Sequence, residues 1–191
     1  MSPRQQRGLI GEISILRMLV EHFGDAAVDY WLGPTDTYES LHDFVGTSLH
    51  IETKATTTNP PVVEIHNITQ LDWRGPYSLI LSVVHITEED SGQSLNEFIS
   101  ETEGMIGSDS KKQRFIQLCQ FSGFNPELHY DTNHVIHSTR FFNIDCDSPI
   151  LQPDRFDDLP RSILDITYTL AANHLTEIDQ SDVDLSGFIS T

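Results

Sequence analysis

Hydrophobic residues recur at helical spacing near the start of the chain. Between residues 4 and 23 the apolar positions lie three or four residues apart, at Leu9, Ile13, Leu16, Val20 and Phe23. This spacing predicts an amphipathic helix that ends near Gly24. Two later helices are predicted, one after the capping-box sequence Ser94-Leu95-Asn96-Glu97 and one over residues 111–121.

Strand-like segments, rich in β-branched and aromatic residues, occupy much of the remaining chain. They are residues 28–32, 39–45, 49–56, 62–66, 77–86, 134–147 and 162–170. Gly46-Thr47 predicts a tight two-residue turn between two of them, and a short helix is expected near Thr69. The order of elements indicates one α+β, or mixed α/β, domain over residues 1–178, followed by a polar acidic tail at 179–191.

Composition fits a globular protein of ordinary size. The chain has 191 residues, of which 38% are hydrophobic and 21% charged. No apolar run approaches the roughly 20 residues that span a bilayer, so we expect no membrane partner. Cys119 and Cys146 are the two cysteines, which implies no disulfide framework and favours a cytoplasmic location.

The net charge of −18, from 11 basic and 29 acidic residues, opposes strong autonomous binding to nucleic acid. Phosphate neutralisation supplies most of the affinity of such binding. A local basic patch remains compatible with this charge. The densest cluster is Lys111, Lys112 and Arg114, which we interpret either as a DNA contact or as an ordinary solvated helix face.

Candidate chemistry lies on the segment 49–56. Alternation places Glu52 and Lys54 on one face of a strand. With a two-residue turn, Asp43 would face His50 and lie diagonally from Glu52, roughly 7–8 Å away; a three-residue loop would turn Asp43 to the other face. Two carboxylates that hold a divalent cation beside a lysine provide the chemistry of metal-dependent phosphodiester hydrolysis.

Glu12 falls inside the apolar stripe of the first helix, where an unpaired carboxylate would be costly. Gly8 and Gly11 would let this helix approach a sheet closely. Glu12 therefore either meets a metal ion, its water or a buried partner such as Lys54, or lies at the stripe edge and reaches solvent. Glu52-Thr53-Lys54 alone would be a common solvated-strand pattern.

Five segments together resemble the PD-(D/E)XK, or restriction-endonuclease-like, nuclease superfamily, in particular a branch associated with bacterial restriction and phage defence. They are Gly8–Glu12, Trp31–Pro34, His42–Phe44, Ile51–Thr56 and Gln70-Leu71. The resemblance is strongest over residues 8–83. It implies a restriction-endonuclease-like core, in which a mixed β-sheet with a three-stranded antiparallel meander is flanked by helices.

The resemblance also implies roles for individual residues. The catalytic side chains would be Glu12, Asp43, Glu52, Lys54 and Gln70. Asp43, Glu52 and the main-chain carbonyl of Thr53 would hold Mg²⁺ or Mn²⁺, and Lys54 would position the attacking water. Glu12 would be the helix-borne glutamate found in many members, and Gln70 an accessory residue that orients the site.

Two functional hypotheses follow. The first is a Mg²⁺-dependent DNA endonuclease of a restriction or phage-defence system, acting as a homodimer or with a partner subunit. The second is a catalytically inactive nuclease-fold scaffold, or an acidic DNA mimic that binds a basic partner. The net charge of −18 motivates the second hypothesis.

Overall fold

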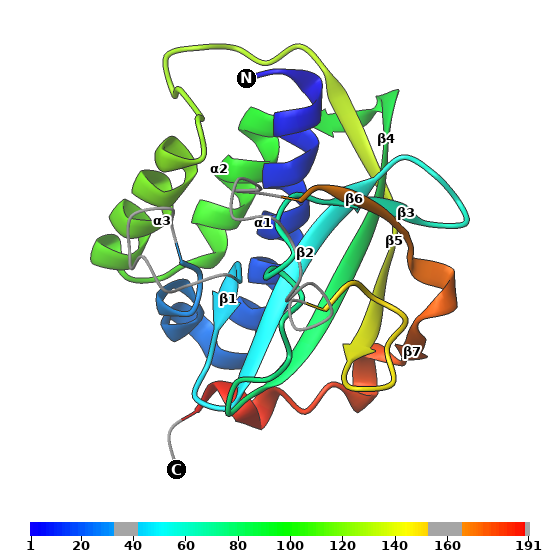
Figure 1. Cartoon of the computed structure of the whole chain (residues 1–191). Coiled ribbons are helices and arrows are strands. Elements are labelled where there is room, and N and C mark those ends of the chain that lie inside the picture. The colour runs from blue at the N-terminus through cyan, green and yellow to red at the C-terminus, as the bar shows by residue number, and fades with distance from the viewer. Residues whose placement is uncertain (33–41, 153–165, 190–191) are drawn as a thin grey trace.

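The computed structural model describes residues 1–32, 42–152 and 166–189. A five-stranded sheet crosses the molecule in the order β1-β2-β4-β5-β7 (Figure 1). Its strands are Phe44–Val45 (β1), Leu49–Thr56 (β2), Ser78–Ser94 (β4), Asn133–Ile144 (β5) and Thr176–Ile178 (β7). β2 and β4 are parallel, and the other neighbouring strands are antiparallel. A separate two-stranded sheet pairs β3 (Val62–Ile65) with β6 (Tyr168–Ala171).

Three α-helices accompany the large sheet: α1 (Pro3–Phe23), α2 (Leu95–Met105) and α3 (Asp109–Phe121). α1 and α2 each begin with a capping box, formed by Ser2 with Gln5 and by Ser94 with Glu97, and the second of these was predicted. The described residues also form four 3₁₀ segments: Gly24–Asp29 (η1), Ala172–His174 (η3), Gln180–Asp182 (η4) and Leu185–Phe188 (η5). None of the described helices combines the length and apolar character needed to cross a membrane.

Apolar side chains cover both faces of the large sheet. One core lies between the sheet and the helices, and Leu16 and Ile51 belong to it. The other lies between the sheet and the β3–β6 pair, and includes Ile65 and Leu81. Figure 1 shows the three helices gathered on one side of the sheet. The predicted fold class, α+β with a mixed sheet flanked by helices, is confirmed.

The expected antiparallel meander forms only in part. β1 and β2 are antiparallel, but β3 leaves the sheet and the next strand beside β2 is β4, which runs parallel to it. β4 is buried without interruption from Leu79 to Val84, and a strand covered on both faces suits a central position. β3 has only four residues, and Val62 is exposed, so it suits the smaller sheet.

Local predictions fail where turn geometry or a long-range contact decides the conformation. The strand expected over residues 28–32 is an isolated bridge between Trp31 and Phe44. The helix expected near Thr69 is a turn, in which the Asp72 N–H donates to the Thr69 carbonyl. Of the strand expected over 162–170, residues 162–165 lie outside the described part, as do 33–41, and the strand β6 begins at Tyr168.

The segment from residue 179 to 189 is packed, so the expectation of a loose polar tail is wrong there. Val183 is 7% exposed and Phe188 2% exposed, and both belong to the helix-side core. The Ser48 N–H donates to the Gly187 carbonyl at 2.8 Å. A Cβ on Gly46 would lie 2.6 Å from the Phe188 Cα, so only glycine permits this approach.

Candidate active site

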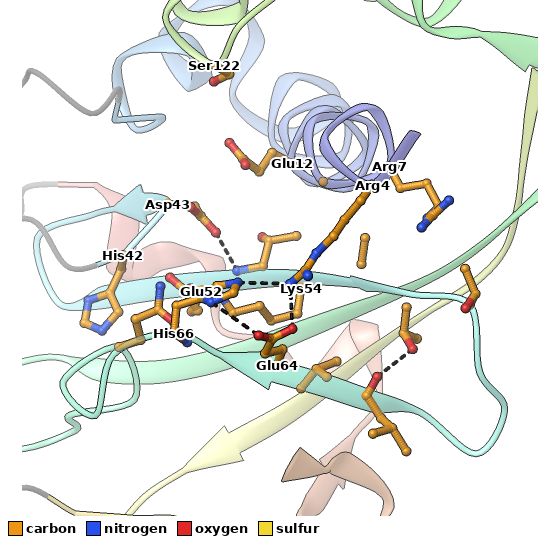
Figure 2. Close-up of a pocket in the computed structure, with 18 of the residues that line it drawn as sticks. Arg4, Arg7, Glu12, His42, Asp43, Glu52, Lys54, Glu64, His66 and Ser122 are labelled. Carbon is orange, nitrogen blue, oxygen red and sulfur yellow. Dashed lines mark hydrogen bonds and ion pairs between the residues drawn. The ribbon is translucent and has the colours of Figure 1, made fainter. Parts of the chain in front are cut away.

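A cavity of about 670 Å³ lies beside β2 and takes its walls from α1, from the segment before β1 and from β3. Its lining includes all five side chains predicted as catalytic: Glu12, Asp43, Glu52, Lys54 and Gln70. In Figure 2, Glu12 reaches from α1 and Asp43 from the segment before β1 into the space beside β2. The tertiary structure therefore brings these residues together from four separate stretches of chain.

The register of the hairpin places Asp43 beside Glu52. Phe44 pairs with Ile51 and Val45 with His50. Continued by one residue, this register puts Asp43 opposite Glu52, so the predicted pairing of Asp43 with His50 is wrong. Four residues, 46–49, lie between the paired Val45 and His50, where two were predicted between paired residues, and the Gly46 N–H donates to the Leu49 carbonyl. A shift of two residues keeps each side chain on its predicted face, and directly opposite positions lie closer together than diagonal ones.

The side chains of β2 alternate between the two faces of the sheet. Leu49 and Ile51 belong to the core under α1. By alternation, Glu52 and Lys54 point to the opposite face, where β3 lies. α1 rests directly on β2, because a Cβ on Gly11 would lie 3.5 Å from the Ala55 Cβ. Glu12 follows Gly11 on α1 and therefore reaches the cavity from the helix side of the sheet. Side chains from both faces of the sheet thus line the cavity, which lies at the edge of β2.

Each carboxylate is fixed by a specific donor. Lys54 Nζ donates to Glu52 Oε1 at 2.5 Å, and the Thr53 N–H donates to Asp43 Oδ2 at 2.7 Å. Glu12 Oε2 accepts a hydrogen bond of 2.9 Å from Trp31 Nε1. Glu12 therefore has a buried partner, as one of the interpretations predicted. Its hydrogen-bond partner is the Trp31 indole, whereas the Lys54 charge only lowers the pKa of Glu12.

Trp31 and its neighbour Leu32 order two sides of the cavity at once. The Trp31 indole is 1% exposed and stacks on Phe44 with ring centroids 6.4 Å apart. The Leu32 N–H donates to the Asp43 carbonyl at 2.9 Å, so the same short segment holds the backbone of Asp43 and the side chain of Glu12. Sequence reasoning missed this arrangement, because it depends on the contact between residues 31 and 44.

The cavity has too little positive charge for its carboxylates. Burial raises the pKa of Glu52 to about 8, the Asp43 charge adds to the rise and Lys54 opposes it. Burial and the Asp43 charge also raise the pKa of Glu12 well above its usual value. Burial alone would lower the pKa of Lys54, but the Glu52 and Asp43 carboxylates outweigh it and hold that pKa above normal. Three carboxyl groups therefore share one ammonium group.

The donor atoms fit an oxygen-preferring divalent cation. Among the described residues, no group of three His, Cys, Asp or Glu side chains could hold a metal ion by itself. Mg²⁺ does not require such a cage, since it binds through one or two carboxylates and keeps several waters. Asp43 and Glu52 supply such carboxylates, and a bound cation would favour their ionised forms, which burial disfavours.

The Thr53 carbonyl lies on the same side of β2 as Asp43. On an extended strand, the N–H and C=O of one residue face the same neighbour, and the Thr53 N–H faces the Asp43 carboxylate. β1 begins at Phe44, so among the described residues no residue of β1 lies opposite Thr53. This carbonyl can therefore serve as a third oxygen donor.

Gln70 lines the cavity, but its side chain forms a hydrogen bond within the turn that follows β3. Gln70 Oε1 accepts from the His66 N–H at 3.0 Å and so orders the turn after β3. The predicted DNA contacts Lys111, Lys112 and Arg114 lie on α3 and are not part of the cavity lining. Lys111 Nζ binds Asp29, and Arg114 Nε lies 3.9 Å from the same carboxylate.

Five charged or titratable residues of the cavity were missed: Arg4, Arg7, His42, Glu64 and His66. A signal existed for the first of them, because Arg4, Gly8 and Glu12 follow one another at four-residue spacing and share a helix face. Glu64 and His66 carry no such signal, since β3 was expected inside the sheet. Only the pairing of β3 with β6 places them beside this cavity.

Comparison with known proteins gives one match. A family model described as "Putative PD-(D/E)XK family member, (DUF4420)" matches residues 1–173, a range that includes every residue of the cavity. Searches of curated proteins and of solved structures returned no match. The resemblance to the PD-(D/E)XK superfamily is thereby confirmed, and the chain belongs to the DUF4420 family.

Proposed function

We propose that the protein is a metal-dependent deoxyribonuclease that hydrolyses phosphodiester bonds with Mg²⁺ or Mn²⁺. The observation that carries the proposal is that Glu12, Asp43, Glu52 and Lys54 line one cavity of a PD-(D/E)XK family member. The family points to a nuclease, and these side chains supply the oxygen donors and the cationic group that such hydrolysis needs.

Each residue has a definite task in this proposal. Asp43 and Glu52 hold the cation, which when bound supplies Lewis-acid polarisation of a phosphoryl oxygen. Lys54 keeps its positive charge in a partly buried position, steadies the attacking water and offsets negative charge that grows on the phosphate. Glu12, oriented by the Trp31 indole, is placed to accept a proton or to hold a water molecule.

Replacing Lys54 tests this function. Lys54→Ala should reduce the cleavage rate of DNA with Mg²⁺ or Mn²⁺ by about 100-fold or more, because one preorganised charged group is typically worth that much. The assay is the conversion of supercoiled plasmid to nicked and linear forms, accompanied by circular dichroism to verify folding. Equal rates for the folded variant and the wild type would refute the assignment.

Lys112→Ala is a suitable companion variant, because Lys112 lies on α3, outside the cavity lining. If the α3 cluster contacts DNA, this substitution should raise KM and leave kcat unchanged. An unchanged KM would identify the cluster as a solvated helix face.

We further propose that the protein acts within a restriction or phage-defence system, either as a homodimer or with a partner subunit that delivers DNA. The net charge of −18 supports assistance by a partner, because it repels the duplex beyond the immediate site. Analytical ultracentrifugation tests the homodimer. A monomer that cleaves DNA efficiently without a partner would remove the need for either arrangement.

The same charge favours a second candidate, an inactive nuclease-fold scaffold or an acidic DNA mimic. Titration calorimetry with Mg²⁺ or Mn²⁺ separates the two. Metal uptake that disappears in Asp43→Asn and Glu52→Gln supports the nuclease. Tight, salt-sensitive association with a basic protein, together with no metal uptake, supports the mimic.

A further inference from the structure

Arg4 occupies the cavity but has no part in the chemistry described above. It lies in the first turn of α1, and its Nη2 donates to Glu64 Oε2 at 2.6 Å and to His66 Nε2 at 3.2 Å. Figure 2 shows the Arg4 side chain extending from α1 toward Glu64 on β3, past Lys54. The guanidinium is thus held at the mouth of the cavity, next to the proposed reaction centre.

Basic residues are concentrated in this cavity relative to the rest of the chain. Of the 11 Lys and Arg residues, three line it: Arg4, Arg7 and Lys54. The chain has 29 Asp and Glu residues, and among those that the structure describes, four line the cavity: Glu12, Asp43, Glu52 and Glu64. The acidic excess of the chain is therefore much smaller at this cavity, where three basic residues lie beside four acidic ones.

The two arginines are arranged differently. Arg7 forms an ion pair with Glu88 on β4, and Figure 2 shows its side chain turned away from Glu12. Arg4 extends toward the cavity and is 64% exposed. Arg4 is therefore the arginine that an entering substrate can reach without breaking into the packed structure.

The Arg4–Glu64 pair contributes little to folding. Exposed ion pairs are weak in general, and Glu64 is 40% exposed. α1 is anchored independently, because Leu9 and Ile13 are buried in the helix-side core. A guanidinium binds carboxylate and phosphate with the same planar set of donors. Glu64 consequently occupies the position that a phosphate group of a substrate would take.

We propose that Arg4 anchors a phosphate of the nucleic-acid strand next to the bond that is cleaved, and that Glu64 holds this guanidinium until the substrate displaces it. The inference rests on the proposed function, because the phosphate is that of a nuclease substrate. It predicts effects of opposite sign for the two members of one ion pair. Removing Arg4 weakens substrate binding, and removing the Glu64 charge strengthens it.

The test is equilibrium binding of a short labelled DNA duplex, and of its single strand, with Ca²⁺ as the divalent cation. Arg4→Gln should weaken binding about tenfold and reduce the slope of log K against log salt concentration by about one. Glu64→Gln should tighten binding several-fold. Arg140→Gln is the control for loss of one positive charge, because Arg140 forms an ion pair with Glu177 outside the cavity. Thermal unfolding should show the same melting temperature for all three variants.

The outcomes separate this inference from the proposed nuclease activity. Equal affinities for Arg4→Gln and Arg140→Gln, or weaker binding by Glu64→Gln, would overturn the anchor even if the wild type cleaves DNA. No detectable binding by the wild type at low salt would overturn it as well. Cleavage that does not depend on Lys54 would remove the nuclease assignment, whereas a selective binding defect in Arg4→Gln would still establish the anchor.

Discussion

At the scale of single residues, the cavity is defined by charges that the fold keeps out of water. Glu52 is 2% exposed and bound to Lys54, while Asp43 accepts from the Thr53 N–H and Glu12 is held by Trp31. Three carboxyl groups and one ammonium group leave a negative excess when all are ionised. Burial raises the pKa values of all three carboxyl groups, and the Asp43 charge adds to the rise for Glu12 and Glu52. The negative excess would attract a divalent cation.

The raised pKa of Glu52 predicts that stability depends on pH. Its value changes from the usual 4.5 to about 8 on folding, so between these limits the folded protein retains a proton that the unfolded chain has released. The metal-free protein should therefore lose stability as pH rises through this window, by about 1 kcal/mol per pH unit for one proton. Denaturant unfolding between pH 6 and 8, in the presence of a chelator, measures the slope.

Glu52→Gln should flatten that slope and make the protein more stable at the upper end of the window. Glu21→Gln, on the exposed face of α1, is the control and should keep the wild-type slope. A slope that survives unchanged in Glu52→Gln would mean that Glu52 is not the group that takes up the proton.

At the scale of elements, the position of α1 on β2 decides where Glu12 and Arg4 lie. The contact occurs at Gly11, whose absent side chain lets the helix approach Ala55. Sequence reasoning predicted this close approach from Gly8 and Gly11 together. Only Gly11 makes the close contact between the helix and the sheet, because an added Cβ on Gly8 would meet no atom within 4 Å. Gly8 lines the cavity instead.

Substitutions at Gly11 should separate helix propensity from packing. Gly11→Ala adds one methyl group at ordinary contact distance and should be neutral or stabilising by up to about 1 kcal/mol. Gly11→Leu should displace α1 from β2, lower stability by about 1–3 kcal/mol and abolish cleavage. Thermal unfolding and the plasmid assay provide the readouts.

Gly104→Leu provides a matched control on another helix. An added Cβ there meets no atom within 4 Å, so stability and activity should stay close to those of the wild type. If Gly11→Leu were as well tolerated as Gly104→Leu, α1 would not be fixed to β2 at this point.

At the scale of the whole molecule, the C-terminal segment 179–189 packs against the β1–β2 hairpin, which directly follows Asp43. Phe188 packs on Phe23 and Tyr30, with ring centroids 6.0 and 5.0 Å away, at the end of α1 and just after it. The neighbouring Gly187 carbonyl accepts from the Ser48 N–H in the β1–β2 turn. Residues at the two ends of the chain thus meet at the element that positions the site.

Phe188→Ala should therefore destabilise the protein by about 3–5 kcal/mol, the usual range for removing a buried phenylalanine side chain. Ile189→Ala should have little effect, because Ile189 is 50% exposed. Denaturant unfolding of the two variants makes the comparison. Similar stabilities for both would show that residues 179–189 are dispensable, as expected for a polar tail.

Residue patterns within one segment were sufficient for much of the prediction. Helical spacing located α1 and α3, the capping box located the start of α2, and alternation placed Glu52 beside Lys54. These features depend on neighbours within about four positions, where backbone geometry fixes which side chains share a face. The resemblance of short motifs added the superfamily, which the family match confirmed.

Long-range pairing decided the remainder. The direction of β4, the departure of β3 to pair with β6, the Trp31–Glu12 hydrogen bond and the burial of Phe188 each join residues far apart in sequence. Such contacts depend on how the whole chain packs its apolar surfaces and pairs its buried polar groups. The spacing of residues within one segment does not determine that packing. The sequence by itself therefore determined which groups could perform the chemistry, and only the tertiary structure decided that they share one cavity with Arg4 and Glu64.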